Sequence, residues 1–138
     1  AASRAQLVKE VIAPTLSRDQ IVICDRYTAS TVAYQGYGRG LSLELIEQVN
    51  QAATGGLEAD LTILLSVAPE AGLARKKDDI KDTFEAQDID FHDRVQQGYR
   101  ALAAAHPSGW VVLDGSLPVR EVSAQIWQKV QPFLLRKG

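Results

Sequence analysis

Residues 24–40 bring together side chains that can bind a phosphorylated nucleotide. Asp25 and Arg26 follow directly on an apolar run at residues 21–23. The guanidinium of Arg26 offers a planar set of donors that matches the oxygens of a phosphate group. Side chains that can hydrogen-bond a base or a sugar come a few residues later: Ser30, Thr31, Tyr34 and Gln35. The pattern predicts a nucleotide-phosphate pocket at the end of a strand, where α/β folds bind their ligands.

The composition narrows the class of protein. The 138 residues are 46% hydrophobic and 23% charged, as in one globular domain with a core. A net charge of -2 argues against a general affinity for nucleic acid, which requires a basic face. The apolar stretches are too short to cross a membrane, and no signal-peptide pattern opens the sequence. We therefore expect a cytoplasmic protein with no nucleic-acid or membrane partner.

The hydrophobic pattern indicates which elements position these side chains. Strands are expected at 20–24, 61–67 and 110–113, and helices at 2–17, 28–35, from Ser42 to Gly55-Gly56, at 87–105 and from Pro118 onward. The glycines at 36, 38 and 40 are expected to form a loop. Strands that alternate with helices predict an α/β fold with parallel strands and crossover helices.

Two side-chain expectations follow from these elements. The single cysteine, Cys24, lies in an apolar strand and is expected to be a packed thiol, and no cluster of Cys and His is present to bind a metal. The last helix carries an apolar stripe that is expected to face the core: Val119, Val122, Ile126, Trp127, Val130, Phe133 and Leu134.

Several spaced motifs together resemble a known family. Asp25-Arg26-Tyr27, Ala33-Tyr34-Gln35-Gly36 and Gly38-Arg39-Gly40 closely resemble bacterial thymidylate kinases, and further matches follow in order along the chain, at Arg4-Ala5-Gln6, 53–57, 69–75, 82–85 and 112–114. The resemblance implies an α/β fold of the P-loop nucleoside monophosphate kinase type, with helices on both faces of a parallel sheet. It also implies transfer of the γ-phosphoryl group of ATP to dTMP with Mg²⁺, which gives dTDP for dTTP biosynthesis, by a cytoplasmic homodimer.

The resemblance further implies that part of the domain lies outside these residues. The family's glycine-rich ATP loop is absent, since no Gly-x-x-x-x-Gly-Lys-Ser/Thr motif occurs in the chain. Residues 1–138 are expected to be the C-terminal portion of one thymidylate kinase domain, with three of about five strands and a lid at about 75–85. Two interior strands would then face a gap with unpaired backbone groups. Alone, the piece is expected to be inactive and to be unstable, rearranged or associated.

The resemblance assigns acceptor-side roles to individual residues. Arg26 matches the arginine that holds the dTMP phosphate, and Arg4 is given a similar part; surface arginines in salt bridges are the alternative. Thr31, Tyr34 and Gln35 fall where the family contacts thymine and sugar, although Tyr34 also fits plain packing. Arg39 reaches phosphate or braces the glycine loop. Asp25 orients Arg26 or lies near the reacting phosphate, with a structural ion pair as the alternative.

On the ATP side, the family's lid, where cations stabilise charge on the transferred phosphoryl group, is resembled by Arg75, Lys76, Lys77 and Lys81. Thr83 stands where an arginine is common in the family. Glu85 matches an acidic residue near the metal and the acceptor, and a glutamate that simply begins a helix is the alternative. Two rival functions remain open: another nucleoside or nucleotide kinase of this fold, and a non-catalytic binding or assembly module.

Overall fold

A computed structural model of the chain describes residues 1–68 and 85–135, except for the side chains of 85–88 and 135. Its first element is one continuous helix made of α1 (Ala2–Leu7), the wider π-helical η1 (Val8–Ile12) and α2 (Ala13–Leu16). The widening lies directly before Pro14, which has no N–H to donate to the preceding turn. The backbone N–H of Ala13 donates to the carbonyl of Val8 instead. The helix expected at 2–17 is confirmed.

The second helical element was expected to end earlier than it does. α3 (Thr28–Thr31) continues into the π-helical η2 (Val32–Gly38), so Gly36 and Gly38 lie inside a helix and only Gly40, with φ 73°, lies beyond it. The prediction of a loop with all three glycines was therefore wrong. Gly36 and Gly38 are buried, because the helix approaches its neighbours so closely there that no side chain fits.

α4 (Leu43–Thr54) has the ends that the sequence predicted. The backbone N–H of Leu45 donates to the hydroxyl of Ser42 at 3.3 Å, as expected of an N-cap serine. Gly55 ends the helix with a left-handed φ of 62°, a conformation that glycine adopts without strain.

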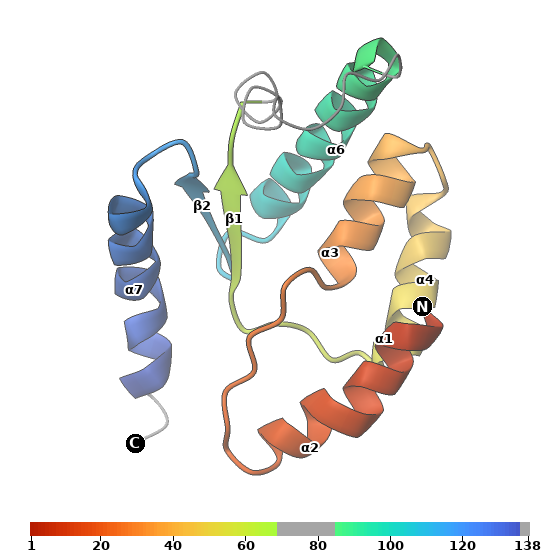
Figure 1. Ribbon diagram of the computed structural model, residues 1–138. Helices are drawn as coiled ribbons and strands as arrows, with labels where there is room; N and C mark the ends of the chain where they lie inside the picture. Colours follow the sequence, from red (N-terminus) through yellow and green to blue (C-terminus); the bar gives the residue numbers. More distant parts are fainter. Residues whose placement is uncertain (69–84, 136–138) are drawn as a thin grey trace.

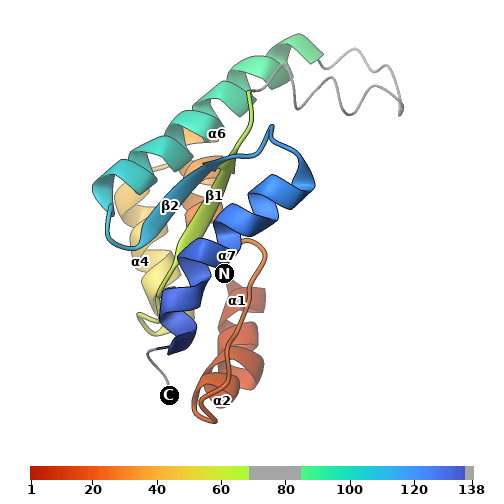
Figure 2. The same cartoon turned by 90° about the vertical axis from the view of Figure 1, so that its left-hand side faces the viewer.

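The sheet places two parallel strands between helices. β1 (Thr62–Ser66) pairs with β2 (Trp110–Asp114) in a register that runs from Thr62 opposite Trp110 to Ser66 opposite Asp114. α6 (Glu85–Ala105) precedes β2 and lies on one side of the sheet, and α7 (Val119–Leu135) lies on the other, as Figures 1 and 2 show. The expected α/β class with a parallel sheet is confirmed.

The strand expected at 20–24 does not form. These residues are extended but unpaired, and β1 and β2 are the only strands in the described part of the chain. The side chain of Ile23 is 95% exposed, and Cys24 is exposed rather than packed. A β-strand forms only when its backbone hydrogen-bonds to a neighbouring strand, and the described residues provide no such neighbour for this segment. The prediction of three strands is corrected to two.

The core lies mainly where η2, α4 and α6 meet, and Leu113 of β2 is also buried. Ala33, Ile46 and Val95 are buried there. In contrast, Leu65 on β1 and Val112 on β2 are 47% and 51% exposed. They belong to opposite faces, because Val112 pairs with Leu64 and side chains alternate along a strand. Apolar surface is thus uncovered on both faces of the sheet.

α7 departs in part from the expected core-facing stripe, since Val119 and Trp127 are exposed whereas Val122 and Ile126 are partly covered. None of the described helices combines the length and the apolar character that a membrane crossing requires.

Candidate functional site

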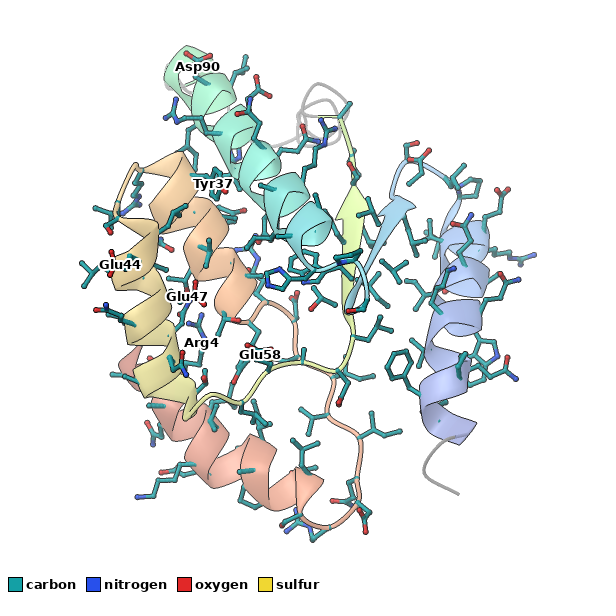
Figure 3. The ribbon with its side chains drawn as sticks, turned by 180° about the vertical axis from the view of Figure 1, so that it is seen from behind. Arg4, Tyr37, Glu44, Glu47, Glu58 and Asp90 are labelled. Atoms are coloured by element: carbon teal, nitrogen blue, oxygen red, sulfur yellow. The ribbon has the colours of Figure 1, made fainter. Side chains whose placement is uncertain are left out.

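Arg4 reaches inward from α1 to a point where three elements meet, as Figure 3 shows from behind. Its Nη1 donates to Oδ1 of Asn50 on α4 at 2.8 Å. Its Nη2 donates to the backbone carbonyl of Tyr27 at 3.1 Å and to the hydroxyl of Thr31 at 2.9 Å. The guanidinium carbon also lies 5.6 Å from the centre of the Tyr27 ring, within the range of a cation–π contact. Arg4 therefore joins α1 to α3 and α4.

Arg26 lies just before the same helix and has a strained backbone. Its φ of 64° is in the left-handed region, which only a few per cent of non-glycine residues adopt. Its Nη2 donates to the hydroxyl of Tyr34 at 3.0 Å, and its guanidinium carbon lies 5.0 Å from the Tyr34 ring centre. Tyr34 thus holds the exposed guanidinium in place.

The two arginines are held along one side of the α3–η2 helix. Arg4 bonds Thr31 and Arg26 bonds Tyr34, and residues three apart are neighbours on a helix surface. All the recorded hydrogen-bond acceptors of both guanidiniums are neutral. Within the described residues no carboxylate pairs with either cation, so the salt-bridge alternative is not what positions them. Two uncompensated positive charges beside hydroxyl groups suit an anionic ligand that also carries polar groups.

α6 supports this helix with aromatic side chains. Tyr34 packs edge-to-face against Phe91 and Tyr99, with ring centres 6.0 Å and 6.4 Å away. The hydroxyls of Ser30 and Tyr99 share a hydrogen bond of 2.8 Å. Ser30 therefore faces α6, whereas Thr31 and Tyr34 face the arginines. Tyr34 combines packing with a polar contact, so both interpretations of it apply.

Three other predicted site residues make no side-chain hydrogen bond within the described part of the chain. Gln35 is half-buried on η2, and Arg39 is exposed at the end of that helix. Asp25 is exposed, and no bond between it and Arg26 is found in the described structure. The idea that Asp25 orients Arg26 is therefore not what the structure shows, because Tyr34 occupies that role.

The predicted ATP-side residues cannot be placed. Arg75, Lys76 and Lys77, together with Lys81 and Thr83, lie outside the described residues, and Glu85 begins α6 with its side chain likewise outside them. The residues that the structure does describe contain no group of three or more His, Cys, Asp or Glu side chains able to hold a metal ion.

The buried polar face of α4 was not predicted from the sequence. Asn50 and Thr54 are buried one helical turn apart, and Asn50 also donates from Nδ2 to the carbonyl of Thr28 at 3.4 Å. The available signal was their spacing: both continue the buried row that begins with Ile46, where an apolar residue is the rule.

Tyr27 is a third residue with a role that was not predicted from the sequence. Its hydroxyl donates to the carbonyl of Leu57 at 3.1 Å. Burial raises the pKa of Tyr27, and the nearby positive charge of Arg4 and a hydrogen bond with Thr54 oppose this only in part. The phenol is therefore neutral at physiological pH and acts as a donor that ties this loop to the end of α4.

A hollow of about 260 Å³ lies elsewhere on the molecule. It is lined by residues near the start of β2 and the end of α6, including Glu58, His106 and Trp110, and contains none of the predicted site residues. Ligand sites of parallel sheets lie at the opposite, carboxyl ends of the strands. We assign this hollow no role.

Comparison with known proteins gives one consistent match. The family model described as thymidylate kinase matches residues 1–126. The chain is 53% identical over 135 residues to a thymidylate kinase of Synechococcus sp., covering 98% of this chain and 65% of the relative. It is 51% identical to that of Nostoc punctiforme, covering 94% and 62%, and 49% identical to that of Deinococcus radiodurans, covering 94% and 63%. The chain thus spans a little under two thirds of the length of these curated relatives.

Proposed function

The chain belongs to the thymidylate kinase family, and from this premise we propose that it forms part of an enzyme that phosphorylates dTMP to dTDP with ATP. The observation that carries the proposal is the pair of guanidiniums, Arg4 and Arg26, held by neutral partners on one side of α3–η2. The phosphate of a nucleoside monophosphate carries negative charge that can pair with these two guanidiniums. A nucleoside has no phosphate and cannot form such pairs.

The predicted site residues that the structure describes are proposed to bind the acceptor nucleotide, dTMP. Arg26 holds the dTMP phosphate, and Arg4 contributes the second positive charge. Thr31, Tyr34 and Gln35 contact the thymine and the sugar, and Ser30 fixes their helix through Tyr99. Arg39 follows η2 with an exposed side chain and is proposed to contact phosphate.

On the ATP side, catalysis is proposed to depend on neutralising the negative charge of the transferred phosphoryl group. Arg75, Lys76 and Lys77 are proposed to cover ATP as a lid at about 75–85 and to stabilise charge on the transferred phosphoryl group, with Asp25 near the reacting phosphate. Mg²⁺ supplies further charge neutralisation when ATP is bound. Enzymes of this chemistry hold Mg²⁺ mainly through substrate phosphates and one or two carboxylates. Glu85 is proposed as a carboxylate on the metal side.

Residues 1–138 are proposed to be the C-terminal portion of a single kinase domain. Apolar surface on both faces of the sheet and the exposed Ile23 support this, since a preceding segment would cover them. That segment would carry the ATP phosphate loop, which has no counterpart in these 138 residues. The homodimer of the intact enzyme and a cytoplasmic location, where ATP is available, complete the proposal.

The test is substitution of Arg26 in the full-length enzyme. Arg26→Ala removes a charge-assisted contact to the phosphate, so dTMP binding should weaken about 10- to 100-fold while ATP binding stays within about twofold. Isothermal titration calorimetry with each nucleotide measures both effects. Arg18→Ala is the matched control, because Arg18 is an exposed arginine whose side chain bonds the nearby Gln20 and none of the predicted site residues that the structure describes. Equal weakening of both nucleotides would remove the role assigned to Arg26.

The same titrations separate the two rival functions. A nucleoside kinase of this fold would bind thymidine at least as tightly as dTMP and would tolerate Arg26→Ala. A non-catalytic module would bind dTMP without converting it in the presence of ATP and Mg²⁺. A glycine-rich loop ending in Lys-Ser/Thr, encoded upstream of Ala1, would argue against the module.

A further inference from the structure

Asn50 occupies a position that a polar side chain rarely holds. It is 7% exposed, on the face of α4 that packs toward α1 and α3, one turn after the buried Ile46. A buried amide is costly unless its oxygen and nitrogen both find partners. In Asn50 both do, and the two partners belong to different elements.

The geometry of these bonds makes Asn50 a bridge. Its Oδ1 accepts from Arg4 on α1 at 2.8 Å, and its Nδ2 donates to the carbonyl of Thr28 at 3.4 Å. The other terminal nitrogen of Arg4 bonds Tyr27 and Thr31. Asn50 therefore fixes both the plane of the guanidinium and the start of the helix on which the other contacts of Arg4 lie.

The choice of an amide also matters for charge. An amide oxygen accepts a hydrogen bond from Arg4 and leaves its positive charge in place. A carboxylate of nearly the same shape would form a salt bridge and neutralise that charge, and in a half-buried site the compensation would be poorly screened by solvent. An amide can thus hold the arginine without competing with an anionic ligand.

We propose that Asn50 is a positioning residue that orients Arg4 for the nucleotide acceptor and keeps its charge uncompensated. The inference rests on the proposed function, because it takes dTMP as the anion that Arg4 serves. It extends that proposal to α4, from which no site residue was expected.

The decisive variant is Asn50→Asp in the full-length enzyme. It retains the acceptor for Arg4 and adds a negative charge, so KM for dTMP should rise about tenfold or more while KM for ATP stays within about twofold. The melting temperature of the free enzyme should change little, because the ion pair that forms with Arg4 offsets the loss of the Nδ2 donor to the Thr28 carbonyl. Gln51→Glu is the matched control, since it adds the same charge on the next, exposed residue of α4 and should leave both KM values unchanged.

A double-mutant cycle separates positioning from mere structural support. Once Arg4 is replaced in Arg4→Ala, the further change Asn50→Asp should leave KM for dTMP within about twofold, because the group that Asn50 serves is gone. If Asn50→Asp fails to fold, the same cycle with Asn50→Ala gives the test: the effects of the two substitutions on KM for dTMP should again be non-additive.

The outcomes also distinguish this inference from the proposed function. If the unmodified enzyme does not phosphorylate dTMP, the proposed function fails. If it does, but the Asn50 variants leave KM for dTMP unchanged, or their effects add to that of Arg4→Ala, then Asn50 is structural only and the inference is overturned.

Discussion

At the scale of single residues, the site is held together by arginines whose partners are neutral. Arg26 keeps a left-handed backbone, which costs of order 1–3 kcal/mol in a non-glycine residue and persists where the surroundings enforce it. The bond to Tyr34 and the ring beneath the guanidinium supply part of that enforcement. Such strain concentrates at functional sites, which agrees with the role proposed for Arg26.

Tyr27 gives a pH prediction at the same scale. Burial raises its pKa, so the folded protein keeps the phenol proton at a pH where the unfolded chain, with an ordinary value of about 10, has lost it. Since the unfolded state then binds fewer protons, stability is unaffected below about pH 9 and falls as the pH rises through about 10 toward the folded pKa. Thermal melting of the full-length enzyme should show this fall.

The control for this prediction is Tyr27→Phe. It loses the bond to Leu57 and melts at a lower temperature at about pH 8, but its further loss of stability at about pH 11 should be smaller than that of the unmodified enzyme. Equal losses in both proteins over that interval would show that Tyr27 does not titrate differently on folding.

At the scale of elements, the acceptor helix depends on close packing between η2 and α6. A Cβ added at Gly38 would lie 2.6 Å from Cε2 of Phe91 and 2.9 Å from Cγ2 of Val95. A Cβ added at Gly98 would lie 2.8 Å from the ring of Tyr37, which is labelled beside α6 in Figure 3. Glycines on both helices thus let them approach, and they position Tyr34 against Phe91 and Tyr99.

Gly38→Ala tests this contact. The added methyl group overpacks the interface, and such changes cost about 1–3 kcal/mol of unfolding free energy. Chemical denaturation of the full-length enzyme measures the loss, and dTMP binding should weaken with it because η2 carries Tyr34.

The matched control is Gly109→Ala, since an added Cβ there meets nothing within 4 Å. It should change the unfolding free energy by less than about 0.5 kcal/mol. If Gly38→Ala were as mild as this control, the close approach of η2 and α6 would not limit stability.

At the scale of the whole molecule, the site and most of the core lie among the helices, while apolar side chains of the sheet are left exposed. Among the described residues β1 is paired on one edge only, by β2, and the segment before α3 crosses near the start of β1 without pairing with it (Figure 1). Exposed backbone groups and apolar side chains at such an edge favour addition of another strand.

Ile23→Ser tests whether a preceding segment covers this edge. Its side chain is almost fully exposed in the 138 residues, so the substitution would be nearly neutral if nothing else covered it. In the full-length enzyme we expect a loss of about 1.5–3 kcal/mol, the value for an isoleucine that is buried on folding. Denaturant unfolding measures the difference.

Val119→Ser serves as the comparison, because Val119 is also highly exposed but lies on α7, on the β2 side of the sheet. It should cost less than about 0.5 kcal/mol. A loss at Ile23 no greater than that at Val119 would contradict the proposal that a further segment covers this edge.

The sequence by itself determined the elements that depend on near neighbours. Helical periodicity, the Ser42 cap and the Gly55 terminator act within a few residues, and the cap and the terminator were predicted at their correct positions. The order of motifs was enough to indicate the family, and the types of the residues at 26–35 indicated a nucleotide site before any geometry was known.

Only the tertiary structure decided the contacts that join distant parts of the chain. Arg4 and Asn50 are 46 residues apart, and nothing local to either predicts their bond. The glycines at 36 and 38 became helical because neighbouring elements pack against them, and residues 20–24 did not become a strand because a strand exists only with a partner beside it. Local propensity acts over a few residues, whereas pairing, burial and the orientation of a charge depend on which segments the fold brings together.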